Sequence, residues 1–154
     1  MSSLHLPLTG SCQCGAIAYK VSEPPLTLYC CHCTECQAQS TSAFGMSLRI
    51  SADSLSFDAE PSVYIRDEGK STQVECLFCP DCGTRLAHRR GSGSANASVK
   101  FSSLDDSQDM EPVGHIWTRS KQAWVILDEE SLVYETQPSD DYAALIERFS
   151  LQHT

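Results

Sequence analysis

The stretch Cys30-Cys31-His32-Cys33-Thr34-Glu35-Cys36 places four of the chain's nine cysteines within seven residues. A shorter group lies on either side of it, Cys12-Gln13-Cys14 before and Cys79-Pro80-Asp81-Cys82 after. Cysteines spaced as C-x-C or C-x-x-C are typical of metal-binding turns, whereas cysteines scattered through a core show no such spacing. We therefore interpret the chain as short segments held together by metal ions.

Length and composition describe one globular domain over residues 1–154. The chain is 41% hydrophobic and 20% charged, and it contains no apolar run near the roughly 18 residues of a membrane helix. The first residues lack the basic flank and apolar core of a signal peptide, so we expect a cytoplasmic protein without a membrane partner. In a reducing compartment, clustered cysteines are metal ligands more often than disulfides, and their odd number agrees with this.

The chain is acidic, with a net charge of -9 and only 11 lysines and arginines. A nucleic acid partner is not expected, because phosphate binding depends on a basic surface. A local basic cluster follows the last cysteine pair, at Arg85, His88, Arg89 and Arg90. It is a candidate anion contact, and a solvated strand end is the alternative.

Short segments of alternating polarity predict a mainly β fold of several short antiparallel sheets held together by zinc. A single helical turn is expected at 33–39. Strands are expected at 17–21, 26–30, 43–50, 54–57, 63–66, 72–78, 85–89, 97–101, 113–117 and 123–127.

One helix is expected at the C-terminus, over about 139–151. Ser139 is a suitable N-cap, and two aspartates follow it at the positive end of the helix dipole. Apolar residues then recur with helical spacing, at Tyr142, Leu145, Ile146 and Phe149.

The outer cysteine pairs predict one structural zinc site with four thiolate ligands, which zinc holds in a tetrahedron. Each pair is followed by a glycine, Gly15 or Gly83, and glycine suits the positive φ that such a turn needs. The predicted ligands are Cys12, Cys14, Cys79 and Cys82. The alternative is two pairs of reduced core cysteines.

The central stretch predicts a second zinc with three ligands, Cys31, Cys33 and Cys36. Consecutive side chains of a strand point to opposite faces, so Cys30 should face away. Three protein ligands with one open position are the pattern of a catalytic zinc. The alternative is a closed site whose fourth ligand is Cys30, Cys76 or His32.

Two residues near these ligands have simpler interpretations. Cys76 shares a strand face with Val74 and Phe78, which favours a place in the core. His32 should point away from the ligands on either side of it. It forms a structural hydrogen bond, orients a neighbouring group or carries a proton.

The ordered cysteine motifs resemble one family. They are Gly10-Ser11-Cys12-Gln13-Cys14-Gly15, Cys31-His32-Cys33-Thr34-Glu35-Cys36 and Cys79-Pro80-Asp81-Cys82-Gly83-Thr84. Two later segments fit as well, Ser103-Leu104-Asp105-Asp106 and His115-Ile116-Trp117-Thr118-Arg119-Ser120-Lys121. The family is that of the glutathione-dependent formaldehyde-activating enzymes, also named for centromere protein V, and the likeness covers about residues 10–127.

The resemblance implies a fold like that of the Mss4 protein and two zinc ions per chain. Its structural site would fall on Cys12, Cys14, Cys79 and Cys82, and its catalytic site on Cys31, Cys33 and Cys36. The implied activity is that of a carbon–sulfur lyase, joining a thiol such as glutathione to a small aldehyde, with S-(hydroxymethyl)glutathione as the type product. The basic N-terminal extension of the centromere-associated members is missing, so a chromatin role does not carry over.

Several points stay open at this stage. The rival functions are a non-catalytic zinc-stapled binding module and a thiol- or metal-handling protein. A homodimer is the default expectation for the assembly. The carboxylates of glutathione would need positively charged side chains to bind them. The sequence offers six candidates and does not show which of them bind: Arg49, Arg66, Arg85, Arg89, Arg90 and Lys121.

Overall fold

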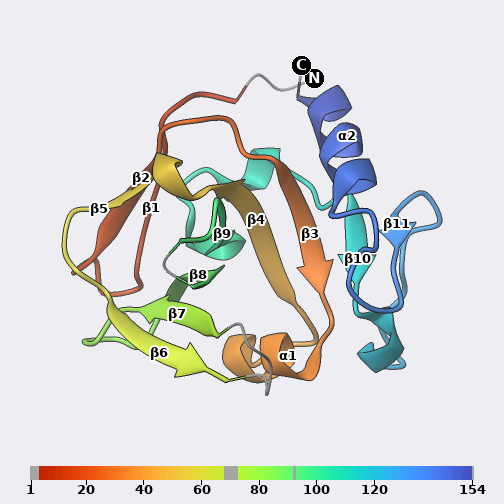
Figure 1. Ribbon diagram of the computed structural model, residues 1–154, viewed down its shortest axis with the longest axis horizontal. Helices are drawn as coiled ribbons and strands as arrows, with labels where there is room; N and C mark the ends of the chain where they lie inside the picture. The colour runs from red at the N-terminus through yellow and green to blue at the C-terminus, as the bar shows by residue number, and fades with distance from the viewer. Residues whose placement is uncertain (1–3, 68–72, 92, 154) are drawn as a thin grey trace.

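The computed structural model describes residues 4–67, 73–91 and 93–153, and within them the chain forms two sheets and two helices (Figure 1). The strands are β1 (Leu8–Ser11), β2 (Ala18–Val21), β3 (Thr27–Cys31), β4 (Gly45–Ser51), β5 (Leu55–Phe57), β6 (Ser62–Arg66), β7 (Val74–Phe78), β8 (Arg85–Arg90), β9 (Asn96–Lys100), β10 (Gly114–Ile116) and β11 (Leu132–Val133). The helices are α1 (Thr34–Ser40) and α2 (Ala143–Gln152), with single 3-10 turns at Ala52–Ser54, Phe101–Ser103, Ser107–Asp109 and Thr118–Ser120. The predicted mainly β class with a C-terminal helix is confirmed.

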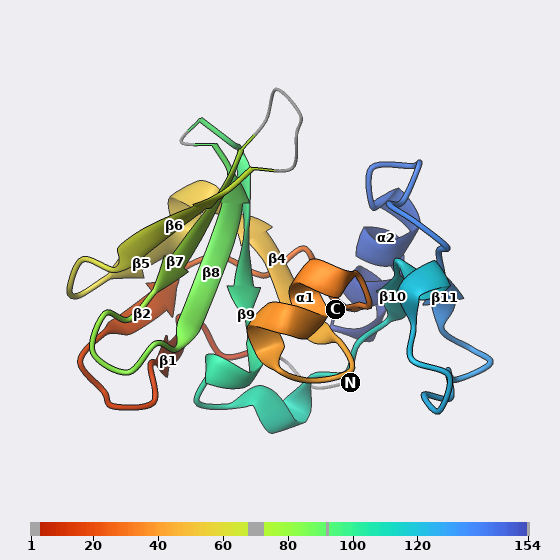
Figure 2. The ribbon, with the colours of Figure 1, turned by 90° about the horizontal axis from the view of Figure 1, so that it is seen from below.

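The larger sheet has eight strands in the order β11-β10-β3-β4-β9-β8-β7-β6, and the smaller has the order β1-β2-β5. The pairing is antiparallel except at one edge, where β10 runs parallel to both β3 and β11. Purely antiparallel sheets were expected, and this edge differs because the long connection after β9 brings β10 back in the direction of β3. In Figures 1 and 2, α1 lies between the β6–β9 half of the sheet and this parallel edge.

The two faces of the large sheet differ in polarity. Leu48 and Ile50 of β4 are fully buried on one face, as are their neighbours on adjacent strands. The intervening positions of β4, Ser47 and Arg49, point to the other face. They pair in register with Tyr29 of β3 and Ser98 of β9. One face therefore forms the apolar core, and the centre of the other face is polar.

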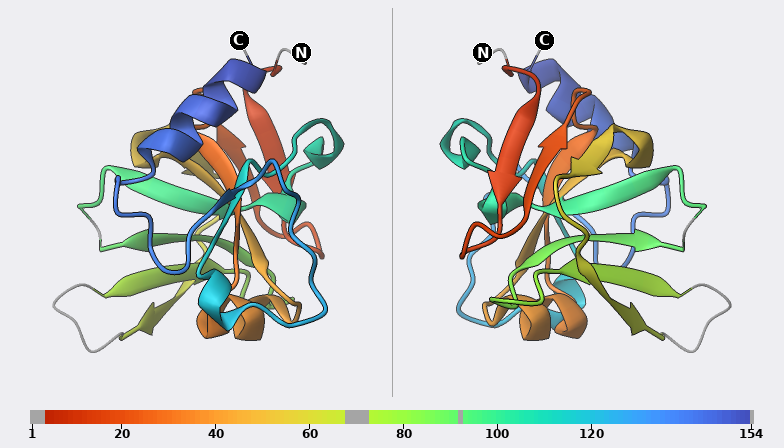
Figure 3. Two further views of the ribbon diagram at one scale, coloured as in Figure 1. Left: turned by 90° about the vertical axis from the view of Figure 1, so that its right-hand side faces the viewer. Right: turned by 90° about the vertical axis from the view of Figure 1, so that its left-hand side faces the viewer.

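Helix α2 starts later than the sequence predicts. It begins at Ala143, after Asp141 and Tyr142 have adopted positive φ angles of 51° and 69°. The predicted N-cap Ser139 is therefore wrong, and the carboxylate of Asp140 accepts a hydrogen bond from the Ala144 N–H at 3.0 Å instead. The helix then packs on β3 through its buried face, at the opposite end of the molecule from α1 (Figure 3).

The predicted strand at 123–127 is also wrong, because this segment is a turn followed by irregular chain. The Lys121 ammonium donates to the carbonyl oxygens of Val125, at 2.7 Å, and Gln122, at 3.2 Å, which closes the segment into a loop. Trp124 and Ile126 are 72% and 93% exposed and flank a buried Val125, so the apolar run does not correspond to a strand packed into the sheet. Of the predicted strand at 72–78, Thr72 lies outside the described residues.

The predicted helical turn at 33–39 is confirmed as α1, which extends to Ser40. Within the described part of the chain, neither helix has the length and apolarity that crossing a membrane requires.

The corrected helix start can be tested by mutation. Asp140→Ala should lower the free energy of unfolding by about 1 kcal/mol, the usual cost of a lost helix cap, because the Ala144 N–H loses its acceptor. Ser139→Ala should change it by less than about 0.5 kcal/mol. Urea unfolding followed by circular dichroism measures both, and equal losses would show that Ser139 caps the helix after all.

Candidate functional site

The outer cysteine pairs meet in space. The Sγ atoms of Cys12, Cys14, Cys79 and Cys82 all lie within 4.8 Å of one another. The Cys12–Cys14 and Cys14–Cys79 sulfur distances are 3.6 Å and 3.8 Å. Four thiolates at the usual zinc–sulfur distance form a tetrahedron with edges of about 3.8 Å. The geometry and chemistry of this donor set therefore fit a four-coordinate zinc.

Two glycine turns create this arrangement. Gly15 and Gly83 have φ angles of +79° and +76°, which side chains disfavour. The Gly83 N–H donates to the Cys79 carbonyl at 2.9 Å, and the Ile17 N–H donates to Cys12 Sγ at 3.3 Å. The cluster thus ties the turn after β1 to the turn between β7 and β8, which are distant in sequence.

The central stretch forms a second cluster, in which the Sγ atoms of Cys31, Cys33 and Cys36 lie within 4.8 Å of one another. Cys31 ends β3, Cys33 caps α1, and Cys36 lies in the first turn of α1. The Cys36 N–H donates to Cys33 Sγ at 3.3 Å. Gly45 lets α1 approach β4, because an added Cβ there would lie 3.2 Å from Cys36 Cβ.

None of the three residues considered as a fourth ligand joins this cluster within the described chain. Cys30 is buried on the other side of β3, where burial raises its pKa to about 12. Cys76 is buried in β7, as predicted for a core residue. His32 is fully buried, and its Nε2 lies 2.9 Å from Nδ1 of His115, which confirms the predicted structural hydrogen bond. The cluster therefore consists of three sulfurs.

The three sulfurs interact strongly with one another. Hydrogen bonds from Cys31 and Cys36 lower the pKa of the Cys33 thiol to about 2, and the bond to Cys33 raises the pKa of Cys31. Three thiolates at this spacing repel one another and require a cation between them. The donor set fits zinc with one coordination position not supplied by these residues.

Lys100 brings a positive charge to this cluster, a role that the sequence did not predict. Burial lowers the pKa of its ammonium group, and the Cys36 and Cys31 thiolates oppose that shift. Lys100 lines a cavity of about 320 Å³ with Gln39 and Ser40 of α1. Its charge offsets part of the negative charge of the thiolates.

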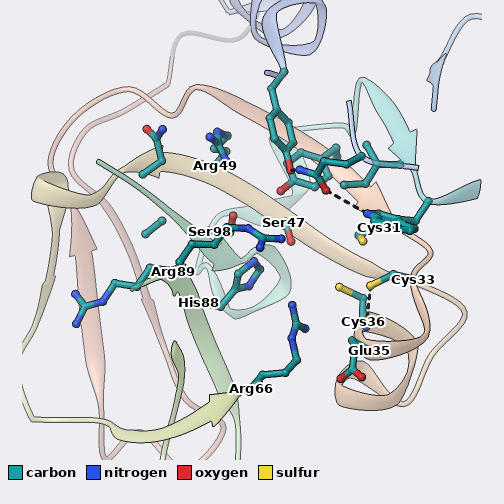
Figure 4. A pocket seen from close by; sticks show the side chains of 18 of the residues that line it. Cys31, Cys33, Glu35, Cys36, Ser47, Arg49, Arg66, His88, Arg89 and Ser98 are labelled. Carbon is teal, nitrogen blue, oxygen red and sulfur yellow. Dashed lines mark hydrogen bonds between the residues drawn. The ribbon is translucent and has the colours of Figure 1, made fainter. Parts of the chain in front are cut away.

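A larger pocket of about 500 Å³ opens beside the three cysteines (Figure 4). Its polar floor is formed by side chains of β3, β4, β8 and β9, namely Tyr29, Ser47, His88 and Ser98. Its cations are Arg49, Arg66, Arg89, Arg90 and Arg119. Exposed Glu35 is the one acidic side chain among the described residues that line it. A cationic pocket in an acidic chain favours an anionic ligand.

The positively charged residues expected from the sequence to bind carboxylates lie in different places in the structure. Arg49, Arg66, Arg89 and Arg90 line the large pocket. Arg85 instead lines the smaller cavity, and Lys121 binds loop carbonyls. His88 and Arg90 of the basic cluster share one face of β8, whereas Arg89 points to the other face and pairs with the Glu75 carboxylate. Arg90 therefore favours the anion contact over the solvated strand end.

Sequence reasoning missed part of the pocket wall. Arg119 lies in the 115–121 segment together with Trp117 and Ser120, which also line the pocket. The 103–106 segment instead supports the small sheet, where the Asp105 carboxylate accepts a hydrogen bond from the Thr9 hydroxyl at 2.6 Å. The polar floor could have been predicted from the sequence of β4, where Ser47 and Arg49 alternate with apolar residues.

Comparisons with known proteins agree with this architecture. A family model described as "Glutathione-dependent formaldehyde-activating enzyme" matches residues 7–120. A crystal structure of a Rhodobacter sphaeroides protein is similar, with a TM-score of 0.51 and 20% sequence identity, over 64% of this chain and 88% of that one. At this identity the likeness concerns the fold alone. A comparison with the curated proteins finds no match.

Metal analysis of variants tests the three-sulfur cluster. Cys33→Ser should lower the bound metal from two ions to one per chain and keep the fold, because the four-cysteine cluster and the core are unchanged. Cys30→Ala is the matched control and should keep both ions, since its sulfur lies outside the cluster. Mass spectrometry of the metal content with circular dichroism measures both effects. Loss of one ion in the Cys30 variant would contradict the three-ligand arrangement.

Proposed function

Because this chain belongs to the glutathione-dependent formaldehyde-activating enzyme family, we propose that it is a zinc-dependent carbon–sulfur lyase. It would make and break the bond between a glutathione-like thiol and a small aldehyde, as in S-(hydroxymethyl)glutathione. The observation that carries the proposal is the position of the three-sulfur cluster in the wall of an arginine-lined pocket. Two zinc ions per chain are part of the proposal.

The two clusters would have different roles. Cys12, Cys14, Cys79 and Cys82 would hold a structural zinc that joins distant turns. Cys31, Cys33 and Cys36 would hold the catalytic zinc, and a bound zinc favours the deprotonated form of an incoming thiol. Three sulfurs face the pocket and leave space for a fourth, which supports a thiol as the ligand on that side.

The chain's own residues would bind and orient the substrates. The arginines would hold the carboxylates of the thiol, and its polar backbone would lie over the polar floor at Ser47 and Ser98. Holding thiolate and aldehyde together makes their reaction effectively unimolecular. The thiolate sulfur attacks the carbonyl carbon, a C–S bond forms, and the carbonyl π pair moves to the oxygen, which takes a proton. Cleavage is the reverse.

The pocket favours an enzyme over the two rival functions. A closed structural site needs no cavity beside its sulfurs, whereas here the sulfurs line a 500 Å³ pocket with five arginines. A metal-handling protein needs exposed and movable thiols, but Cys31 and Cys36 are buried between β3 and α1. The cytoplasmic location and the homodimer stay predictions.

The proposal is tested by the rate at which glutathione and formaldehyde form their adduct, measured by NMR exchange above the uncatalysed rate. The wild-type chain should accelerate this exchange. Cys33→Ser should reduce the acceleration by at least about 100-fold, since losing a ligand should cost more than the ~10–100-fold of an outer-shell change. Cys30→Ala should retain it. If Cys33→Ser and wild type behave alike, the catalytic role of the cluster fails.

A further inference from the structure

We propose that Arg49 is the residue that selects the thiol, by binding a carboxylate that lies on the order of 10 Å from the reacting sulfur. Such an anchor would let the site distinguish glutathione, the thiol of the proposed function, from a single cysteine. This inference rests on the proposed function of the same site. Three observations support it. Within the described part of the chain, the Arg49 guanidinium lacks a full set of hydrogen-bond partners, the floor of the pocket is polar, and this floor extends from Arg49 to the three cysteines.

The guanidinium group of Arg49 lacks a full set of hydrogen-bond partners in the described structure. It is half-buried, and its Nε is buried without a hydrogen-bond partner among the described residues. The Tyr142 ring lies 4.2 Å from the guanidinium carbon and fixes its position through a cation–π contact. By contrast, Arg89 is paired with the Glu75 carboxylate. A partly desolvated guanidinium is stabilised by an anion, and its planar fork matches a carboxylate.

The pocket offers this guanidinium no anion of its own within the described lining. The acidic residue there, Glu35, lies on α1 beyond the cysteines, at the other end of the pocket from Arg49 (Figure 4). Glu35 is also exposed, so water screens its charge. An anion that satisfies Arg49 must therefore come from the ligand.

A polar surface joins Arg49 to the three cysteines. Ser47 lies between them on β4 (Figure 4), and Ser98 pairs in register with Arg49 from β9. Both serines are nearly inaccessible, with exposures of 1% and 4%. These side chains make the floor of the pocket polar, which suits a peptide lying across it better than an apolar ligand.

The strand register gives the length of this surface. Arg49 is opposite Thr27, which is four residues before Cys31 on β3. At about 3.4 Å per residue, this corresponds to about 14 Å along the strand. Part of that length is covered by the arginine side chain, leaving a gap on the order of 10 Å. One residue spans at most about 3.6 Å, so the carboxylate of free cysteine lies too close to its own sulfur. A residue joined to the cysteine, as on either side of a central cysteine in a tripeptide, carries a carboxylate farther from the sulfur.

The test measures binding without requiring chemistry at the metal. S-methylglutathione keeps both carboxylates but has no free thiol, and calorimetry gives its affinity for the zinc-loaded chain. Arg49→Gln should weaken this binding by about 10-fold to 100-fold, the range for a charge-assisted hydrogen bond. Arg85→Gln is the matched control, with the same loss of charge outside this pocket, and should bind as wild type does.

Two additional measurements separate an anchor from a general loss of charge. Amidation of one of the two carboxylates of S-methylglutathione should weaken binding to wild type, and the same amidation should have little further effect on Arg49→Gln. Arg49→Lys keeps the charge and much of the packing on Tyr142, so it should bind between wild type and the glutamine variant. Thermal unfolding checks that each variant is folded.

The outcomes distinguish this inference from the function on which it rests. If wild type forms the glutathione–formaldehyde adduct but Arg49→Gln binds S-methylglutathione as tightly as wild type, only the role of Arg49 is overturned. Equal weakening by Arg85→Gln also overturns it, since charge alone would then explain the effect. If wild type neither binds S-methylglutathione nor accelerates adduct formation, both the anchor and the proposed function fail.

Discussion

Sulfur atoms held within 4.8 Å of one another are the constraint on which the rest of the structure depends. Neutral thiols gain little from such contacts, whereas thiolates repel one another unless a cation lies between them. The four-cysteine cluster joins the turn after β1 to the β7–β8 turn, and the three-cysteine cluster joins β3 to α1. With many short strands and few helical residues, the fold would gain long-range connections from metal ions bound at these two clusters.

The second constraint is the balance of charge around the three-cysteine cluster. The chain is acidic overall, yet five arginines line the adjoining pocket, and buried Lys100 adds a positive charge near the sulfurs. These cations offset the negative charge of the thiolates and of an anionic thiol entering beside them. The polar face of the large sheet makes this possible, because the apolar core uses the opposite face.

The sequence predicts the local features of this protein well and its long-range features poorly. Cysteine spacing and the glycines after each pair act over a few residues, so both clusters could be identified without a structure. The ranking of Arg49 above Arg85 depends on register across β3, β4 and β9, which no local pattern records. The segment 123–127 was misassigned because it forms a turn in which Trp124 and Ile126 are exposed, and α2 starts late because Asp141 and Tyr142 adopt positive φ.

The two halves of the pocket would contribute differently to catalysis. A zinc bound by three thiolates is a weak Lewis acid, so it would polarise an aldehyde little and act mainly by positioning the sulfur. Most of the rate enhancement must then come from holding two reactants in reacting geometry. Binding energy from a remote group such as a carboxylate on Arg49 is useful for this, because it fixes the thiol without stabilising its sulfur further. The distance between Arg49 and the cysteines would therefore determine how well a thiol of a given length is positioned for the proposed reaction.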